Sequence, residues 1–424
     1  MNVVVIGSGG REHALALKIK ESSQLSSLFI LPGNPGTASL GENVSINISD
    51  HKKIVEFCKE KKIDLVVIGP EQPLVDGLAN VLRQNRINVF GPNKEAAEIE
   101  SSKYFAKHIM KESGVLNAKY LPFTSNMFEH ANDYLKSKKY PCVIKVDGLA
   151  AGKGVFVCND QKEAVEALNI IFKDKVFGDS GEKVLVEEFL EGQEASVFGI
   201  CDGNDCICLP ASQDHKRIGD NDTGKNTGGM GAYAPAPIVS PQMLESIKNK
   251  IMIPVLNTLK KNNKEFIGCL YAGLMITEEG PKVIEFNCRF GDPETQVVLP
   301  IIKGDFLDLL YSAASGKLNR KAVEYNGGCS VCVVAASGGY PDSYEKGFEI
   351  SGLDEVPSDI IVYHAGTKEE NEKILTNGGR VLGVTSVLPE FNLMLAKDKA
   401  YQAIEKISFK NMYFRKDISD KALK

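Results

Sequence analysis

The sequence predicts a chain of several mixed domains, α/β at the N-terminus and α+β beyond it, and three observations predict this fold class. The chain has 424 residues, enough for two to four domains of ordinary size. Over residues 1–100, short apolar runs alternate with helical segments, which is typical of a doubly wound parallel sheet. Short strands dominate the segment after residue 326, so a small β-rich C-terminal domain is expected.

Composition excludes several classes of function. Hydrophobic residues make up 43% of the chain and charged residues 25%, which is ordinary for a protein that buries sizeable cores. The net charge of −5 provides no general basic field for nucleic acid. No apolar run reaches the roughly 18 residues that a membrane span needs, and no leader pattern precedes the first strand. We therefore expect a cytoplasmic protein without nucleic-acid or membrane partners.

The ten cysteines are scattered and several lie inside apolar, strand-like runs. Cys329 and Cys332 form a C-x-x-C pattern, but three residues apart on a strand they point to opposite faces. No second pair lies at zinc-site spacing, so buried free thiols are expected.

Four strands and their connections make up the N-terminal segment. The strands are expected at residues 3–6, 28–31, 64–70 and 87–92, with a helix at 11–20 directly after the first. Ligands of such sheets bind where the carboxyl ends of the strands meet. Loop residues 9–12, 33–37 and 69–71 follow three of these ends and are therefore candidates for one site.

The opening stretch "VVVIGSGGREHA" places Gly7, Gly9 and Gly10 between a strand and a helix. A dinucleotide fingerprint needs a third glycine three residues after the second, and Glu12 stands there instead. The acidic residue expected about twenty residues later is also missing. Two interpretations remain: a structural turn, and a phosphate-bearing small molecule held at the helix N-terminus. We favour the second.

A helix at 102–114 leads to strands at 142–146, 154–158 and 183–190, with the glycine-rich stretch "DGLAAGKGV" between the first two. Gly148 and Gly152 have three residues between them, and Lys153 is followed by Gly154, so the spacing is not that of a P-loop. The loop can fold over nucleotide phosphates beside Lys145, or it is merely a mobile hairpin tip.

Further on, "KVLVEEFLEGQEAS" brings an apolar strand to Glu187 and Glu188, then to Phe189 and Leu190. Main-chain groups beside such apolar side chains can hydrogen-bond the edge of an adenine ring. Glu194, beyond the turn, can accept hydrogen bonds from ribose hydroxyls. The alternative is that these acids are simply solvated.

The stretch "PKVIEFNCRFGDPETQ" places Val283, Glu285 and Asn287 two residues apart, so on a strand they share one face. Carboxylate and amide oxygens side by side suit a magnesium ion that also binds phosphate oxygens. Arg289 continues the pattern and suits a carboxylate or a transferring phosphoryl group. A structural ion pair is the alternative for the charged residues.

The segment "SQDHKRIGDNDTGKNTGGMGAY" has almost no apolar periodicity, and such long irregular loops are usually functional or disordered. Asp214, His215, Lys216 and Arg217 together suit a zwitterionic substrate, with His215 as a binding residue rather than a general base. The rest of the chain is expected to hold strands at 194–200, 270–276, 281–287, 329–336, 360–366 and 379–387, and helices at 241–261, 304–316 and 393–407.

Taken together, these motifs resemble the ATP-grasp ligases and, within them, the glycinamide ribonucleotide synthetase (phosphoribosylamine–glycine ligase) family. The resemblance covers essentially the whole chain, through "GSGGREHALA", "PGNPGT", "GPEQPLVDGL", "DGLAAGKGV", "EEFLEGQEAS", "SQDHKR", "DTGKNTGGMGAY", "LYAGLM", "IEFNCRFGDPETQ", "HAGT" and "TNGGRVLGVT". It implies an N-terminal α/β domain (1–101), an ATP-grasp domain (102–325) with a mobile lid subdomain (121–192), and a C-terminal domain (326–424). One departure is Ser419, where the family pattern leads us to expect glycine.

The resemblance also implies a reaction. ATP, glycine and 5-phosphoribosylamine would give glycinamide ribonucleotide, ADP and phosphate by way of glycyl phosphate, with Mg²⁺ or Mn²⁺ as cofactor. Carried over by position, the ATP residues are Lys103, Lys145, Gly152, Lys153, Gly154, Glu187, Glu188, Phe189, Leu190 and Glu194, and the metal residues are Glu285 and Asn287. The substrate residues are Gly9, Gly10, Arg11, Asn34, Gly36, Thr37, Glu71, Asp214, His215, Lys216 and Arg289. Lys145, Asp214 and Arg289 are the expected catalytic residues.

Two other functions compete with this one. A second ATP-grasp enzyme, acting on bicarbonate or formate, is expected to lack the "SQDHKR…NTGGMGAY" loop. A non-catalytic or NAD-dependent protein would not turn over ATP and leaves Glu285 and Asn287 unexplained. For the favoured ligase we expect a monomer that makes transient contact with the amidotransferase producing its amine.

Overall fold

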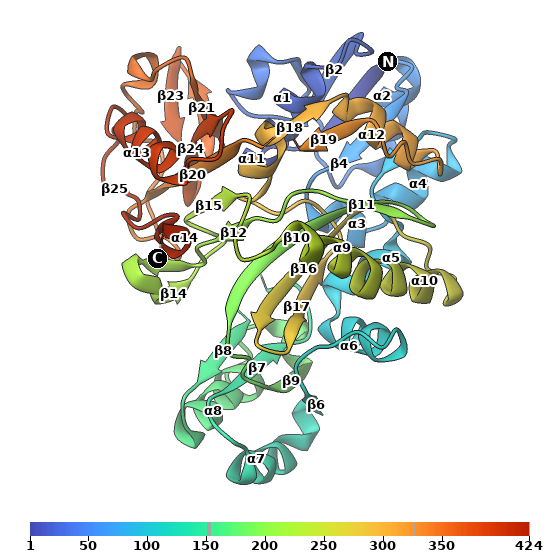
Figure 1. The fold of residues 1–424 in the computed structure, drawn as a ribbon, viewed down its shortest axis with the longest axis vertical. Coiled ribbons are helices and arrows are strands. Elements are labelled where there is room, and N and C mark those ends of the chain that lie inside the picture. Colours follow the sequence, from blue (N-terminus) through green and yellow to red (C-terminus); the bar gives the residue numbers. More distant parts are fainter. Residues whose placement is uncertain (151–153, 326, 424) are drawn as a thin grey trace.

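The computed structural model describes residues 1–150, 154–325 and 327–423. Figure 1 shows the N-terminal (blue) and C-terminal (red) parts side by side, with the central sheet beneath them and a lobe projecting below.

The N-terminal part is built on a parallel sheet with strand order β3-β2-β1-β4-β5, which confirms the predicted doubly wound domain. Its strands are β1 (Asn2–Gly7), β2 (Ser27–Pro32), β3 (Glu42–Asn43), β4 (Leu65–Ile68) and β5 (Val89–Phe90). Its helices are α1 (Gly10–Lys20), α2 (His51–Glu60), α3 (Glu71–Val75), α4 (Leu78–Gln84) and α5 (Lys94–Ser101). The β-branched run in β1 is fully buried, because helices cover both faces of a parallel sheet.

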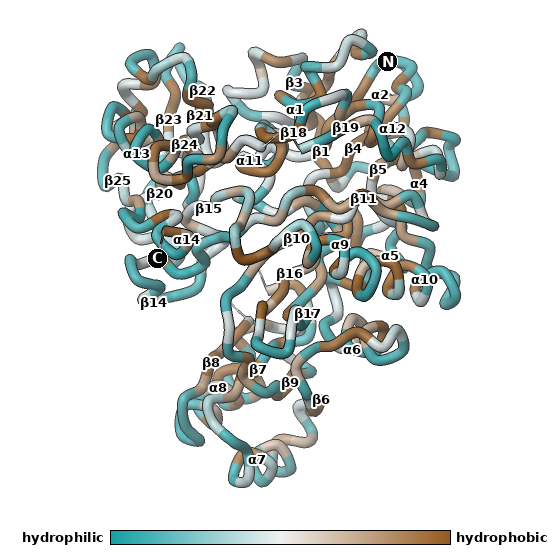
Figure 2. The backbone as a smooth tube through the Cα atoms, in the orientation of Figure 1, coloured by the Kyte–Doolittle hydropathy of each residue, from teal (hydrophilic) through white to brown (hydrophobic). Residues whose placement is uncertain are grey.

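The projecting lobe is a separate antiparallel sheet with strand order β6-β9-β7-β8. After α6 (Lys103–Glu112) it contains β6 (Tyr120–Thr124), α7 (Phe128–Ser137), β7 (Cys142–Val146), β8 (Val155–Cys158), α8 (Gln161–Leu168) and β9 (Lys183–Glu188). Its apolar side chains form a core of their own, and Figure 2 shows apolar segments on its strands. The glycine-rich loop does join two antiparallel strands, β7 and β8, as predicted.

The central sheet has strand order β11-β10-β16-β17. Its strands are β10 (Gln193–Asp202), β11 (Cys206–Cys208), β16 (Ile267–Thr277) and β17 (Gly280–Asn287). Nearby helices are α9 (Pro241–Ile247), α10 (Ile253–Lys261), α11 (Thr295–Val298) and α12 (Phe306–Ala314). A π-helical turn, Lys248–Met252, joins α9 to α10, so the predicted helix at 241–261 is continuous but not uniformly α-helical.

The predicted alternation along β17 is wrong at one step. Gly273 pairs with Glu285, but the next residue on β16, Leu274, pairs with Val283, so Ile284 is an extra residue in a β-bulge. Paired residues project from the same face, and neighbours on one strand project from opposite faces. Glu285 and Asn287 therefore share a face as predicted, whereas Val283 projects from the other face into the apolar core.

The C-terminal part is organised around the sheet order β12-β15-β20-β24-β21, with β25 beside β20. Its elements are β12 (Gln213–Asp214), β15 (Gly231–Ala234), β20 (Cys329–Ser337), β21 (Ile360–His364), β24 (Arg380–Leu388), α13 (Leu393–Ile404), β25 (Met412–Tyr413) and α14 (Asp420–Leu423). Two-stranded pairs are β13 (Arg217–Gly219) with β14 (Thr223–Asn226), β18 (Ile302–Gly304) with β19 (Val323–Tyr325), and β22 (Thr367–Glu370) with β23 (Lys373–Thr376). This sheet thus crosses the boundary that we predict at residue 326.

All ten cysteines are free thiols, and nine of them are buried, which confirms that prediction. In the described part of the chain, no helix is long and apolar enough to cross a membrane.

We expect Ser419→Gly to stabilise the protein by about 1 kcal/mol. Ser419 is fully buried at φ +71°, where a side chain costs roughly 1–2 kcal/mol, and its Oγ has no hydrogen-bond partner among the described residues. Part of the gain is offset because glycine is more flexible in the unfolded chain. Urea unfolding measures the change, and Ser419→Ala, which removes only the hydroxyl, is the control. Equal effects of both variants would contradict a backbone cause.

Candidate active site

The projecting lobe, which the sequence predicts to be a lid, meets the central sheet at a buried lysine. Lys145 lies on β7, and its Nζ donates to the carbonyl of the bulge residue Ile284 at 3.1 Å. The same Nζ lies 3.1 Å from Oε2 of Glu187 on β9. The predicted nucleotide residues of this lobe are thereby brought close to β17, which carries the predicted metal ligands.

Glu187 has a second cationic partner that the sequence did not reveal. Its Oε1 lies 3.2 Å from Nζ of Lys107 on α6, and both side chains are 2% exposed. Burial lowers the pKa of Lys107 to about 8, against the opposing effect of Glu187. The available signal was that Lys103 and Lys107 are four residues apart, on one face of the predicted helix. Glu187 is therefore held by two lysines, and its predicted contact with adenine stays a prediction.

The first lysine of α6, Lys103, donates from Nζ to the carbonyl of Gly148 at 2.9 Å, at the start of the glycine-rich loop. Burial lowers its pKa, and Glu285 opposes that shift. Gly154, at the loop's other end, accepts the N–H of Val146 at 2.8 Å. The predicted residues Gly152 and Lys153 lie outside the described residues.

The predicted adenine segment leaves β9 at the edge of the site. Glu188 accepts the backbone N–H of Lys119 at 3.0 Å. Phe189 is 39% exposed, and Leu190 is half-buried. An exposed aromatic ring at the edge of the site suits a planar ligand there.

Glu285 and Asn287 fit a divalent cation. They share one face of β17 opposite Gly273, whose missing side chain leaves that face open. Within the described residues, no hydrogen bond or ion pair engages either side chain. Hard oxygen donors without protein partners are what Mg²⁺ or Mn²⁺ requires.

Asp214 and Lys216 come together, but His215 does not join them. Lys216 Nζ lies 3.1 Å from Oδ1 of Asp214 and also donates to Oε2 of Glu194. His215 projects the other way, is fully buried against Tyr233, and has no hydrogen bond to either ring nitrogen among the described residues. Burial lowers the pKa of His215 to about 3. Successive side chains of an extended chain point to opposite sides, so His215 points away from Asp214 and Lys216.

Behind Asp214 lies a buried acid that sequence reasoning missed. Glu294 is 4% exposed and accepts from the Tyr271 hydroxyl at 2.9 Å and from Ser196 Oγ at 3.3 Å. Burial, followed by the nearby Asp214 carboxylate, raises the pKa of Glu294 to about 7. Its only sequence signal was its place in the motif "FGDPETQ".

Arg289 is engaged by two carboxylates. Its guanidinium lies 2.9 Å from Glu100 and 3.2 Å from Glu71, and Arg11 approaches the same Glu71 oxygen at 3.9 Å. Glu100 also accepts the N–H of Cys288 at 2.8 Å. This chain of charges joins the N-terminal domain to the end of β17. Arg289 therefore does form the structural ion pairs that the sequence offered as the alternative to substrate binding.

The other predicted residues of the N-terminal domain surround the start of α1. A Cβ on Gly36 would lie 2.3 Å from the His13 ring, so that position requires glycine, whereas one on Gly10 would lie 2.7 Å from Nε2 at the end of the flexible Gln296 side chain. Asn34 donates to the carbonyls of Ser8 and His364 at 2.8 and 2.9 Å. The predicted residues Gly9 and Thr37 also lie here, and Thr37 is fully buried. Asn34 and Thr37 thus brace the loops.

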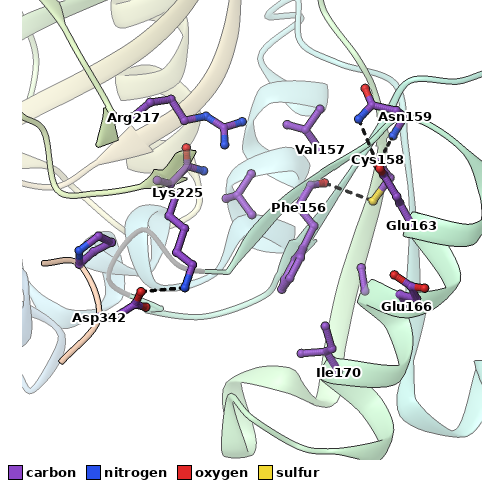
Figure 3. A pocket seen from close by; sticks show the side chains of 14 residues that line it. Phe156, Val157, Cys158, Asn159, Glu163, Glu166, Ile170, Arg217, Lys225 and Asp342 are labelled. Carbon is purple, nitrogen blue, oxygen red and sulfur yellow. Dashed lines mark hydrogen bonds and ion pairs between the residues drawn. The ribbon is translucent and has the colours of Figure 1, made fainter. Parts of the chain in front are cut away.

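A cavity of about 690 Å³ lies elsewhere (Figure 3). It lies between β8 and α8 of the projecting lobe on one side and Arg217, Lys225 and Asp342 on the other. Lys225 and Asp342 form an ion pair of 2.8 Å. Its described lining includes neither Lys145 nor Glu187 nor Glu285. It is therefore distinct from the cluster above.

Comparisons with known proteins cover the entire chain. The phosphoribosylglycinamide synthetase N, ATP-grasp (A) and C domains match residues 1–100, 101–295 and 330–421. The phosphoribosylamine–glycine ligase of Caldanaerobacter subterraneus is 46% identical over 99% of each chain. That of Leptospira interrogans is 46% identical over 100% of this chain and 99% of its own.

Solved structures agree. The crystal structure of phosphoribosylamine–glycine ligase from Thermotoga maritima is 33% identical, with a TM-score of 0.84, covering 99% of this chain and 100% of its own. The biotin carboxylase domain of Hydrogenobacter thermophilus 2-oxoglutarate carboxylase has a TM-score of 0.73, covering 97% of this chain and 91% of its own, but its 17% identity shows the fold alone. Three matched domains and near-complete relatives show that the chain belongs to the phosphoribosylglycinamide synthetase family, with an ATP-grasp fold.

Proposed function

We infer that this chain is an ATP-dependent ligase of purine biosynthesis that joins glycine to 5-phosphoribosylamine, giving glycinamide ribonucleotide, ADP and phosphate. Family membership over the whole length supports the reaction. The structural observation that carries it is the Glu194–Lys216–Asp214 cluster beside the open face of Glu285 and Asn287. An amino-acid subsite would therefore adjoin a nucleotide subsite.

The proposed mechanism proceeds through glycyl phosphate, because a carboxylate does not accept an amine at neutral pH. Phosphoryl transfer needs positioned charge rather than a protein nucleophile. Lys103 and Lys145 would contact ATP phosphates, with Gly152, Lys153 and Gly154 of the loop closing over them. Phe189 and Leu190 would flank adenine, with Glu187 and Glu188 beside them, and Glu194 would meet the ribose.

Glu285 and Asn287 would hold Mg²⁺ or Mn²⁺. When bound, such an ion neutralises phosphate charge and orients the oxygens of the transferring group. The contribution of the chain is to keep both oxygen donors on one face of β17, which the regular alternation beyond the bulge achieves.

Asp214 would bind the glycine ammonium group, and Arg289 would bind its carboxylate or the acyl phosphate. Arg289 contacts Glu71 and Glu100 in this structure. To bind the substrate as well, its guanidinium would have to use some of its N–H donors for the substrate and the others for these two carboxylates. For 5-phosphoribosylamine, the backbone around Gly9, Gly10 and Arg11 at the start of α1 would bind the phosphate. Glu71 would meet the sugar, while Asn34, Gly36 and Thr37 would hold the loop. Lys216 would hold the Asp214 carboxylate through their ion pair, and the buried His215 would support the backbone of the same segment.

We further propose a cytoplasmic monomer that meets, transiently, the amidotransferase supplying the unstable amine. Ten free thiols, nine of them buried, suit a reducing compartment.

Glycine is expected to support ADP release in the presence of 5-phosphoribosylamine, while bicarbonate and formate support none. In the same assay Asp214→Asn should raise the KM for glycine at least about tenfold, because a charge-assisted contact is lost, and change the KM for ATP far less. Asp342→Asn, an exposed acid paired with Lys225, is the control. Turnover with formate, or equal losses for glycine and ATP, would contradict the proposal.

A further inference from the structure

The turn at residues 227–229 is held by two side chains of the C-terminal domain. The N–H of Gly228 donates to the Tyr340 hydroxyl at 2.9 Å, and its carbonyl accepts from NH1 of Arg380 at 2.6 Å. Both polar backbone groups of one residue are therefore bonded to side chains that lie more than a hundred positions later in the sequence.

The motif "TNGGRVLGVT" explains how Arg380 reaches this turn. A Cβ on Gly378 would lie 2.8 Å from the Cα of Gly366, and one on Gly379 would lie 2.3 Å from the Tyr340 ring. Only glycine permits such close approach. The two glycines therefore let β24 begin directly beside Tyr340, and Arg380 is its first residue.

The same guanidinium fixes a second segment of the site. NH1 of Arg380 also donates to the carbonyl of Asp292 at 2.7 Å and lies 3.2 Å from the Asp292 carboxylate. On the other side, a Cβ on Gly229 would lie 2.5 Å from Pro293 Cδ. Arg380 thus joins the 227–229 turn to the segment between Arg289 and Glu294.

A short series of hydrogen bonds connects the turn with the amino-acid subsite. Thr227 donates to the carbonyl of Lys216 from its N–H at 2.7 Å and from Oγ1 at 2.8 Å, and Met230 N–H donates to the His215 carbonyl at 2.8 Å. Asp214 is paired with Ala232, three residues after the turn. Movement of the turn would consequently shift the backbone of Lys216, whose Nζ contacts Asp214.

We propose that Arg380, assisted by Tyr340, is a positioning residue of the ligase: it holds the 227–229 turn so that Lys216 and Asp214 stay aligned to receive the amino acid. The inference rests on the proposed placement of glycine at Asp214. One nitrogen, NH1, makes the contacts with both chain segments, and the rigid planar guanidinium fixes its position, which a lysine ammonium on a flexible stem does not reproduce.

The test compares KM values for glycine and ATP in Arg380→Ala, Arg380→Lys and Tyr340→Phe. We expect the glycine KM to rise tenfold or more in Arg380→Ala and severalfold in the other two, with the ATP KM within twofold of wild type. Lys225→Ala is the matched control, since it removes another contact between the same loop and the C-terminal domain, the ion pair with Asp342, and should change neither KM.

A glycine KM within twofold of wild type in the folded variants would overturn the proposal, as would a parallel rise in the ATP KM. If Arg380→Ala does not fold, Arg380→Lys and the nearly isosteric Tyr340→Phe decide. Failure of the proposed function is distinguishable, because the wild-type protein would then show no glycine-dependent ADP release at all.

Discussion

Glu285→Gln is expected to lower turnover by a factor of about one hundred or more, the scale of losing a preorganised charge that stabilises the transition state. Glutamine keeps the shape of the side chain but is a much poorer ligand for a hard cation. The fold should be unaffected, because no described residue is bonded to the Glu285 side chain. Steady-state ADP release measured over a Mg²⁺ titration checks both the loss and a raised metal requirement.

Glu278→Gln provides the control for that experiment, since it makes the same chemical change on an exposed residue of the neighbouring turn. Wild-type turnover with a wild-type metal requirement in Glu285→Gln would return Glu285 to a structural role. A large loss in the control as well would show that the hairpin, rather than the carboxylate, is sensitive.

Glu187→Gln is expected to destabilise the lid subdomain by about 3–5 kcal/mol, the cost of removing one partner from a buried ion pair. Lys107 and Lys145 would remain in place, 2% and 6% exposed in their side chains, without the carboxylate that both now contact. Hydrogen exchange of β9 amides measures this local stability directly, since the lid has its own apolar core.

Glu188→Gln, one residue later and less buried, should change exchange by much less. The double variant Glu187→Gln/Lys107→Met should recover part of the loss, because one of the two unpaired charges is also removed. Unchanged β9 exchange in the single variant would mean that water reaches the lysines and that the ion pairs of Glu187 with Lys107 and Lys145 contribute little to the local stability.

Local patterns predicted the elements well, because hydrophobic periodicity and turn residues act over a few positions. The run at residues 3–6, the hairpin around Gly148 and the strand carrying Glu285 were all found in this way. Asp214 and Lys216 were correctly grouped, since residues two apart on an extended chain share a face. The same rule separates His215 from that group, so the prediction that His215 joins Asp214 and Lys216 is wrong.

Contacts between distant segments were beyond such patterns. The register shift opposite Gly273 depends on how two strands meet, and no residue type marks it. Lys107 and Arg380 acquire partners from segments about 80 and 150 positions away, and Glu294 acquires one about 100 positions away beside its nearer partner Tyr271. Likewise, the sheet that unites β12 and β15 with β20 cannot be seen from composition shifts along the chain.

The bulge in β17 gives one backbone group a role that no side chain shares. Deleting Ile284 alone would restore regular alternation with Leu274–Val283 and Gly273–Glu285 still paired, so Glu285 and Asn287 would keep their face and Phe286 would stay in the apolar core. What would be lost is the extra carbonyl of Ile284, which accepts from Nζ of Lys145 on β7. Such a deletion would therefore weaken the attachment of the projecting lobe to the central sheet without moving the predicted metal ligands, and the residue type at position 284 should matter less than the presence of that extra peptide unit.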